Sequence, residues 1–374
     1  MMKKISNLLM MALLTIGMGL TSCDEMLDNA VDPGVMPDVE VTSIALNATS
    51  QALNVDDYFA LTATVEPADA DYTLTWSSSD ETIATVDENG IIHAVAEGNA
   101  IITAQAGNMK ATCDILVQDV YAINQYKEAS WDGSKVVFEK KSVAGVGVIT
   151  NDFSGDIKNG WYSVTGNDVT ISANYTLDGD TYLILCDDAQ LTINGQINCG
   201  YNLYIYGQGK GNGKLNIKCN GTAINGHYPD DKVLEIHGGD ITVESTSASG
   251  SSLSGNGFNM YSGKLTATTS TAPQAIQFYS SINVYGGEVI AENTATAAVH
   301  HGIAGNGNEV ITVYGGKMKV SGGSAPSKAI VAAKFKSGTE NIKLYLSADN
   351  TSWTDGGVYS TAQAPADSRY IKIE

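Results

Sequence analysis

The chain has 374 residues, which is room for two or three domains, and only 17% of them are charged. A formal net charge of −20 at pH 7 and a pI near 4.5 exclude a nucleic-acid-binding role that rests on neutralising phosphates. The charge is uneven, because residues 24–118 contain 17 acidic side chains and a single basic one, Lys110.

The N-terminus has the features of a secretion signal. Lys3 and Lys4 precede an apolar run, residues 8–20, that is short for a membrane span and typical of a signal-peptide core. The run ends in Leu20-Thr-Ser-Cys23, which resembles the lipobox of bacterial lipoproteins. By that resemblance residues 1–22 are the signal peptide and Cys23 is the lipidated first residue of the mature chain. The alternative is an ordinary secretory signal with an incidental cysteine.

Residues 23–39 mix Asp, Pro, Gly and Met without periodicity, so we expect an acidic tether. Asp24-Glu25 resembles the surface-export signal of Bacteroidota-type lipoproteins. The resemblance implies an outer-membrane protein that is lipid-anchored and exposed on the cell surface. We find no second hydrophobic stretch, so the expected membrane contact is through the lipid alone.

Residues 40–118 contain short alternating strands that suit a small β-sandwich. A tryptophan, Trp76, precedes a Ser-rich turn. A strand pair, Ile83-Ala-Thr-Val-Asp87 to Gly90, follows, and the segment closes with Gly98-Asn-Ala-Ile-Ile-Thr-Ala. This sequence pattern resembles that of the bacterial Ig-like group 2 (BIG2) domain. Proteins with such domains include adhesins, and many copies serve as spacers, which is the role we expect here.

The second half of the chain contains a self-similar period. Four strands end in nearly the same phrase: Leu234-Glu-Ile-His-Gly-Gly, Phe258-Asn-Met-Tyr-Ser-Gly, Ile282-Asn-Val-Tyr-Gly-Gly and Ile311-Thr-Val-Tyr-Gly-Gly. Their ring residues are 24, 24 and 29 residues apart, and the strand alternation leaves no room for a helix between units. The pattern predicts a parallel β-solenoid over residues 181–340, with residues 119–180 as a transition and N-terminal cap and residues 341–374 as a C-terminal cap.

The Gly-Gly strands alternate with softer Ala-Ile or Ala-Val segments such as Ala223-Ile and Ala275-Ile. This alternation resembles the repeats of right-handed parallel β-helices in proteins labelled carbohydrate-binding-domain containing. The predicted fold class is therefore all-β: a small Ig-like β-sandwich followed by a right-handed parallel β-helix.

The repeat predicts an outward column of rings on successive coils. Strict alternation places the apolar residues of each phrase inside, so the following set points outward: Tyr206, His237, Tyr261, Tyr285 and Tyr314. With coils about 4.8 Å apart, five rings form a column about 19 Å long, comparable to a few units of an extended polysaccharide. Aromatic faces pack against the C–H faces of sugars, so these five residues are the candidate ligand-binding site. The alternative is a stabilising ladder without a ligand.

A catalytic site is weakly supported. Glycoside hydrolysis needs two carboxyls at a defined separation, but neighbours in Asp187-Asp188 and in Asp230-Asp231 face opposite ways on a strand. The β-helical lyases and polygalacturonase-like hydrolases neutralise the uronate of their substrates with arginine or a basic cluster, and the single arginine of this chain, Arg369, suits an anionic sugar poorly. His300-His301 suits a surface loop better than a metal site, so we expect no catalytic residues, no metal and no cofactor.

Three further patterns have structural interpretations. Asp87-Glu-Asn-Gly90 suits a hairpin turn better than a calcium loop. The run Gly207-Gln-Gly-Lys-Gly-Asn-Gly213 suits a coil-to-coil turn better than a phosphate cradle, because no helix follows it. Cys199 and Cys219 share the inward alternation of their strands, and whether they form a disulfide stays open.

Together these features predict a non-catalytic cell-surface lipoprotein, engaged in adhesion or in binding a polysaccharide or a host or cell-surface glycan. The alternatives are a β-helical carbohydrate-active enzyme, either hydrolase or lyase, and a purely structural surface component.

Overall fold

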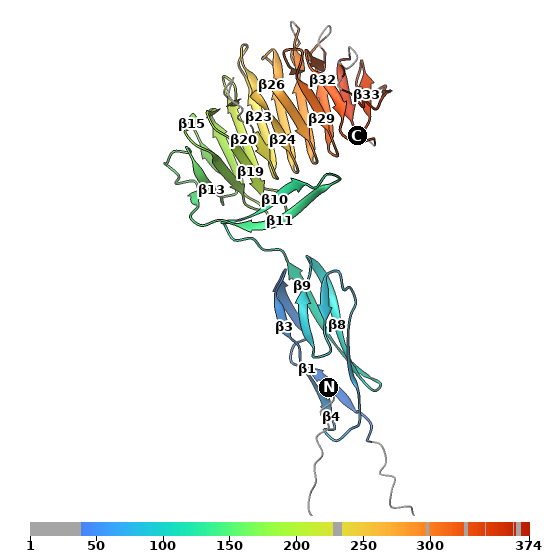
Figure 1. The fold of residues 1–374 in the computed structure, drawn as a ribbon. Helices are drawn as coiled ribbons and strands as arrows, with labels where there is room; N and C mark the ends of the chain where they lie inside the picture. Colours follow the sequence, from blue (N-terminus) through green and yellow to red (C-terminus); the bar gives the residue numbers. More distant parts are fainter. Residues whose placement is uncertain are drawn as a thin grey trace, which may run out of the picture. The chain divides into compact units, whose positions relative to one another are not determined.

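The computed structural model describes residues 39–226, 234–296, 299–324, 328–340, 342–361, 363 and 368–374. These residues form strands, turns and loops (Figure 1), and none of them belongs to a helix long and apolar enough to cross a membrane. The chain divides into two compact units, Met1–Val117 and Gln118–Glu374. The expected signal peptide, the lipidated Cys23 and nearly all of the tether lie outside the described residues.

The first unit is an antiparallel Ig-like sandwich, as predicted. It contains a four-stranded sheet in the order β2-β9-β8-β5, a three-stranded sheet in the order β3-β7-β6, and the pair β1-β4. Leu61, Ile92 and Ile102 are fully buried between the sheets. The strands are β1 (Ser43–Leu46), β2 (Ser50–Asn54), β3 (Tyr58–Ala60), β4 (Ala63–Glu66), β5 (Leu74–Ser78), β6 (Ala84–Val86), β7 (Ile91–Ala94), β8 (Gly98–Ala106) and β9 (Met109–Gln118).

The predicted turn at Asp87–Gly90 joins β6 to β7. Asp87 Oδ1 accepts hydrogen bonds from the backbone N–H groups of Asn89 (2.9 Å) and Ile91 (2.8 Å). Gly90 has a φ of 78°, which favours glycine. The carboxylate is therefore used to close the turn.

The second unit is a β-solenoid of about seven turns, as the repeat predicted. Figure 1 shows its strands lying side by side. Each turn has three strand positions, which we call a, b and c in chain order. Neighbouring coils pair in parallel at all three positions.

The a-strands carry the repeated phrases, and the c-strands contain the Ala-Ile segments. The a-strands are β12 (Gly147–Ile149), β13 (Gly160–Val164), β16 (Thr181–Leu185), β19 (Leu203–Gly207), β22 (Leu234–Ile236), β29 (Val310–Val313) and β32 (Lys334–Ser337). The b-strands are β14 (Val169–Ile171), β17 (Gln190–Asn194), β20 (Lys214–Cys219), β23 (Asp240–Ser245), β25 (Lys264–Thr269), β27 (Glu288–Asn293) and β30 (Lys317–Ser321). The c-strands are β15 (Tyr175–Leu177), β18 (Ile197–Cys199), β21 (Ile224–Gly226), β28 (His301–Ala304) and β31 (Ile330–Val331). Two longer strands, β24 (Ser251–Met260) and β26 (Gln274–Val284), run through a c position and the following a position.

The pairing register follows the sequence repeat. Leu234 pairs with Phe258, Phe258 with Ile282, and Ile282 with Ile311. These side chains and their inward neighbours two residues later are buried in one continuous core. Alternation along each a-strand therefore sends the residues between them, and the ring residues after them, to the outer face.

The coils begin earlier than the expected residue 181. β12 pairs with β13, and β13 pairs in parallel with β16, so the first coils lie within residues 119–180. Before them comes an antiparallel hairpin, β10 (Gln125–Trp131) and β11 (Val136–Ser142), which we call the hairpin. Figure 1 shows it lying across the coils rather than stacking onto them.

The C-terminal segment adds antiparallel strands to the sheet that the b-strands form, which we call the b-sheet. These are β33 (Leu344–Ser347), β34 (Thr354–Gly357) and β35 (Tyr370–Ile373), in the order β30-β35-β33-β34. Phe335 of the last a-strand exchanges backbone hydrogen bonds with Gln363. In the described residues, the last coil is therefore covered at its b-strand by β35 and at its a-strand by Gln363, in keeping with a cap.

Candidate functional site

The five predicted ring residues form one continuous stack, which we call the ladder. Neighbouring ring centroids along Tyr206, His237, Tyr261, Tyr285 and Tyr314 are 4.6, 4.9, 4.9 and 4.7 Å apart. The interplanar angles lie between 9° and 18°, so the rings are nearly parallel. The spacing equals the distance between coils, because each ring stands on the same strand position of its coil.

The stacking changes what the ladder offers to a ligand. We expected the ring faces to be available for sugar packing, but each inner ring uses both faces on its neighbours in the ladder. The ring edges and the tyrosine hydroxyl groups are therefore the parts of the inner rings that a ligand can contact. Burial raises the pKa of Tyr261 to about 12, so its hydroxyl is a neutral donor at physiological pH.

The hairpin covers part of the ladder. The Tyr126 ring lies 4.4 Å from that of Tyr206, and the Trp131 ring lies 5.6 Å from those of Tyr285 and Tyr314. The hairpin thus follows the ladder over several coils. Tyr206 and His237, which we predicted on the outer face, are 4% and 7% exposed because this cover lies over them.

The ladder continues sideways into a second stack that we did not predict. Trp161, Tyr182 and Tyr204 occupy successive coils with centroids 4.4 and 4.7 Å apart and interplanar angles of 11° and 7°. Tyr204 stands two residues before Tyr206 in the same a-strand, so the alternation used for the ladder also places it outside. This alternation was the feature of the sequence from which the outward position of Tyr204 could have been predicted. Tyr126 and Trp131 had no such signal, because the hairpin belongs to no coil.

A polar row follows the second stack on the next coils. Glu235, Asn259 and Asn283 are register partners on β22, β24 and β26. The Asn283 amide donates to Asn259 Oδ1 at 2.9 Å, and the Asn259 amide donates to Glu235 Oε1 at 3.2 Å. This row and the ladder run side by side, two residues apart on each strand.

Glu235 also faces the ladder. Its Oε2 lies 3.4 Å from His237 Nε2. The His237 imidazole and the Asn259 amide lower the pKa of Glu235, against the opposing effect of burial. The outer face of the a-strands, which we call the a-face, therefore presents stacked ring edges, amides and one carboxylate in register.

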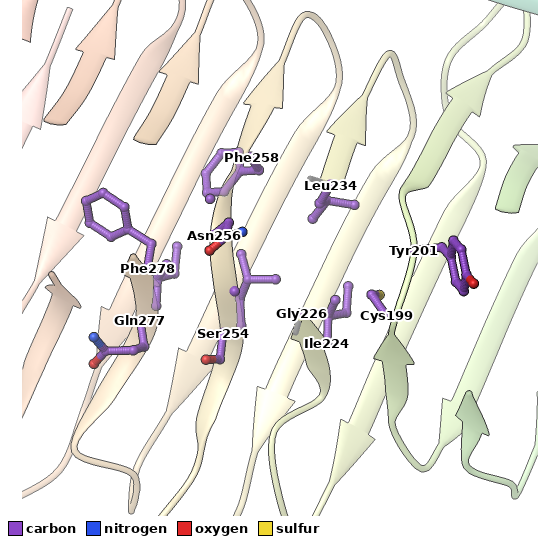
Figure 2. A pocket seen from close by; sticks show the side chains of 14 residues that line it. Cys199, Tyr201, Ile224, Gly226, Leu234, Ser254, Asn256, Phe258, Gln277 and Phe278 are labelled. Carbon is purple, nitrogen blue, oxygen red and sulfur yellow. The ribbon is translucent and has the colours of Figure 1, made fainter. Parts of the chain in front are cut away.

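An apolar cavity lies inside the solenoid near the bend of β24 (Figure 2). Figure 2 shows Phe258, Phe278 and Leu234 around it, with Cys199 on β18 beyond Ile224 of β21. Its volume of ≈ 20 Å³ is room for about one water. Burial raises the pKa of Cys199 to about 12, so its thiol is protonated and unreactive at neutral pH. The described lining is therefore part of the core.

The candidate carboxylate pairs do not form a site in the described residues. Asp187 accepts hydrogen bonds from the backbone N–H groups of Lys210 (3.1 Å) and Gly211 (3.2 Å). Asp188 pairs with the Lys210 ammonium at 2.7 Å. Both fasten the Gly207–Gly213 turn to the preceding coil. Asp230 and Asp231 lie outside the described residues.

The other chemistry-bearing residues have structural surroundings. The backbone N–H of Lys328 donates to His301 Nδ1 at 3.1 Å, and burial lowers the pKa of His301. Cys199 and Cys219 are free thiols on β18 and β20, buried and half-buried. Within the described ranges no three His, Cys, Asp or Glu side chains gather closely enough to hold a metal.

Comparison with known proteins identifies the first unit. Residues 40–115 match the family described as bacterial Ig-like domain (group 2). A lacto-N-biosidase from Bifidobacterium bifidum is 51% identical over 51 residues, which cover 14% of this chain and 5% of that protein. An α-L-arabinofuranosidase from Bifidobacterium longum is 35% identical over 126 residues, covering 29% of this chain and 11% of that protein.

The chain therefore spans about a tenth or less of the length of these two relatives. Among solved structures, domains 4 and 5 of the S-layer protein SbsC match 21% of this chain and 52% of that chain at 19% identity and a TM-score of 0.20. A likeness at that TM-score carries no argument about function.

Proposed function

We propose that this protein is a non-catalytic bacterial cell-surface protein that binds glycan through the outer a-face of its solenoid, with the Ig-like domain as a spacer. The bacterial Ig-like domain supports a surface location. The short matches to two glycosidases are consistent with an environment rich in glycans.

The observation that carries the proposal is the registered outer face. The ladder presents the half-exposed edges of Tyr261, Tyr285 and Tyr314, and the Asn259 and Asn283 amides run beside them. Hydroxyls and amides repeating at the coil spacing can hydrogen-bond successive units of one extended polymer. A polymer that repeats is the ligand such a surface suits best.

Binding is favoured over hydrolysis by the state of the carboxylates. Hydrolysis needs an acid and a base or nucleophile that face one substrate bond. Asp187 and Asp188 instead hold a turn, and Glu235 is bound to its neighbours on the a-face.

The attachment to the outer membrane is proposed from the sequence alone, through lipidation of Cys23. Mass spectrometry of the mature N-terminus, from the natural chain and from Cys23→Ala, tests it. A diacylated Cys23 supports the anchor, and an unmodified N-terminus contradicts it.

A polysaccharide and glycan array probed with the full chain tests binding. We expect wild type to bind at least one polymer and Tyr285→Ala to bind it at least ten-fold more weakly. Thr266→Ala, on β25 of the b-sheet, is the matched control and should bind like wild type.

The alternatives predict different results. Release of reducing sugar from any polymer of the panel would identify an enzyme. If the chain binds no polymer, a purely structural surface component becomes the favoured function. Binding that Tyr285→Ala does not weaken would place the site elsewhere than on the ladder.

A further inference from the structure

A cleft of ≈ 200 Å³ lies between the hairpin and the turns that follow the a-strands. One wall is the hairpin, and the other is the series of glycine-rich turns from three successive coils. Its lining includes Lys127 and Phe138 of the hairpin and Lys210, His237, Ser262 and Gly263 of the turns.

The hairpin wall presents an aromatic ring over a gap. Phe138 pairs with Ala129 across the hairpin, and Lys127 has the same parity as Ala129, so all three share one face. Ala129 is the small residue between them. Phe138 is 53% exposed, and the Lys127 ammonium lies over its ring, 5.8 Å from the centroid. It therefore differs from the inner rings of the ladder, which stack on another ring at both faces.

Part of the opposite wall is bare backbone. Gly239 and Gly263 have φ values of 92° and 84°, a region that favours glycine. A side chain at Gly263 would start 2.3 Å from the Gly239 carbonyl oxygen. Close stacking of the turns thus keeps the glycine part of this wall free of side chains, and its other lining residues are Gln208, Lys210, His237 and Ser262.

The cleft lining contains two lysines and no carboxylate, although the chain has a net charge of −20. Lys210 is paired with Asp188. Lys127 donates to the Gly209 carbonyl oxygen at 2.9 Å and forms no ion pair within the described ranges. An ammonium has three donors, so Lys127 can still bind an anion.

We propose that this cleft binds a single sugar unit that carries a carboxylate, with the C–H face of the sugar on Phe138 and the carboxylate on Lys127. An aromatic face is electron-rich and attracts the weakly positive C–H groups of a sugar. A cleft below the 300–1,000 Å³ of drug-sized sites suits one ring rather than an oligomer. The inference deepens the proposed function by naming a sugar class and a second subsite.

The test compares two probes that differ only in the carboxylate. Methyl β-D-glucuronide and methyl β-D-glucoside are titrated into the full chain by ligand-observed NMR and calorimetry. We expect the glucuronide to bind at least ten-fold more tightly. Lys127→Gln, which can still donate to Gly209, should remove that preference, and Phe138→Ala should abolish binding of both sugars.

Lys141→Gln is the matched control, because it removes the same charge from the hairpin outside the cleft, where Lys141 pairs with Glu139 at 2.8 Å. It should leave the preference unchanged. Near-ultraviolet circular dichroism of each variant verifies that the hairpin stays folded.

The outcomes separate this inference from the proposed function. If the chain binds polymers on the array but neither monosaccharide, or binds both sugars equally, the cleft proposal fails and the a-face proposal stands. Glucuronide binding that survives both Lys127→Gln and Phe138→Ala also overturns the cleft. If the chain binds no polymer and no sugar, both proposals fail.

Discussion

His237 shows how one residue of the ladder differs from the tyrosines around it. It stacks between Tyr206 and Tyr261 as a tyrosine would, but its Nδ1 lies 2.7 Å from the Ala129 carbonyl oxygen of the hairpin. A phenol ring has no donor at that place. An imidazole that carries a proton on Nδ1 can donate to this oxygen while its ring stays in the stack.

Tyr261 tests the energetic role of the ladder at the scale of one residue. Tyr261→Ala removes two stacked contacts, each worth about 0.5–1.5 kcal/mol, so we expect the free energy of unfolding to fall by about 1–3 kcal/mol. Tyr261→Phe keeps the ring and should stay within about 0.5 kcal/mol of wild type. Urea unfolding followed by circular dichroism measures both. Equal stability of the alanine variant and wild type would contradict a stabilising ladder.

The hairpin is the element that turns a ladder into a site. Its β10 strand meets β19 through the Lys127–Gly207 bridge and the coils of β26 and β29 through Trp131. It therefore covers the ladder on one side and leaves the cleft beneath Phe138. Without it the a-face would be a plain sheet of stacked rings.

Trp131→Ala tests whether ring contacts hold the hairpin. Loss of the contacts with Tyr285 and Tyr314 should let the end of the hairpin open, so we expect at least ten-fold faster amide hydrogen exchange in residues 125–142. Exchange in β25 should stay unchanged. Phe138→Ala is the matched control, because its ring faces the cleft and its loss should not speed exchange. Unchanged exchange in the Trp131 variant would show that backbone contacts suffice.

At the scale of the whole molecule, the two compact units differ in architecture and in charge. The strongly acidic Ig-like unit is held by antiparallel strands around its own core, and the solenoid by parallel coils around another. Two separate cores predict two unfolding transitions.

Gly90→Ala should lower only one of these transitions in calorimetry. At φ 78°, the added methyl would lie 2.3 Å from the Leu61 carbonyl oxygen and 2.8 Å from the Trp76 ring. We expect roughly 3 kcal/mol of destabilisation, which is a shift of roughly 10 °C or more for a domain of this size. Gly107→Ala is the matched control: it has a φ of 57° but meets nothing closer than 3.9 Å, so its shift should be smaller. A shift of both transitions by Gly90→Ala would indicate one cooperative unit.

The sequence by itself determined the two architectures and the ladder. Leu234, Phe258, Ile282 and Ile311 repeat on the same parity, and a parallel solenoid is the arrangement that buries all of them in one column. Once that register is set, the rings that follow must lie one above another. Local periodicity was sufficient here because each coil contacts mainly its neighbours.

The tertiary structure alone decided what the ladder can offer. The hairpin contacts join residues more than 80 positions apart, such as Lys127 with Gly209 and Ala129 with His237, and no periodic pattern encodes them. The faces of the inner rings are occupied because stacking at the coil spacing brings neighbouring rings into contact. Phe138 instead stays 53% exposed beside the cleft, with the Lys127 ammonium over its ring. Alternation specifies which way a side chain points, but only the folded chain specifies what then covers it.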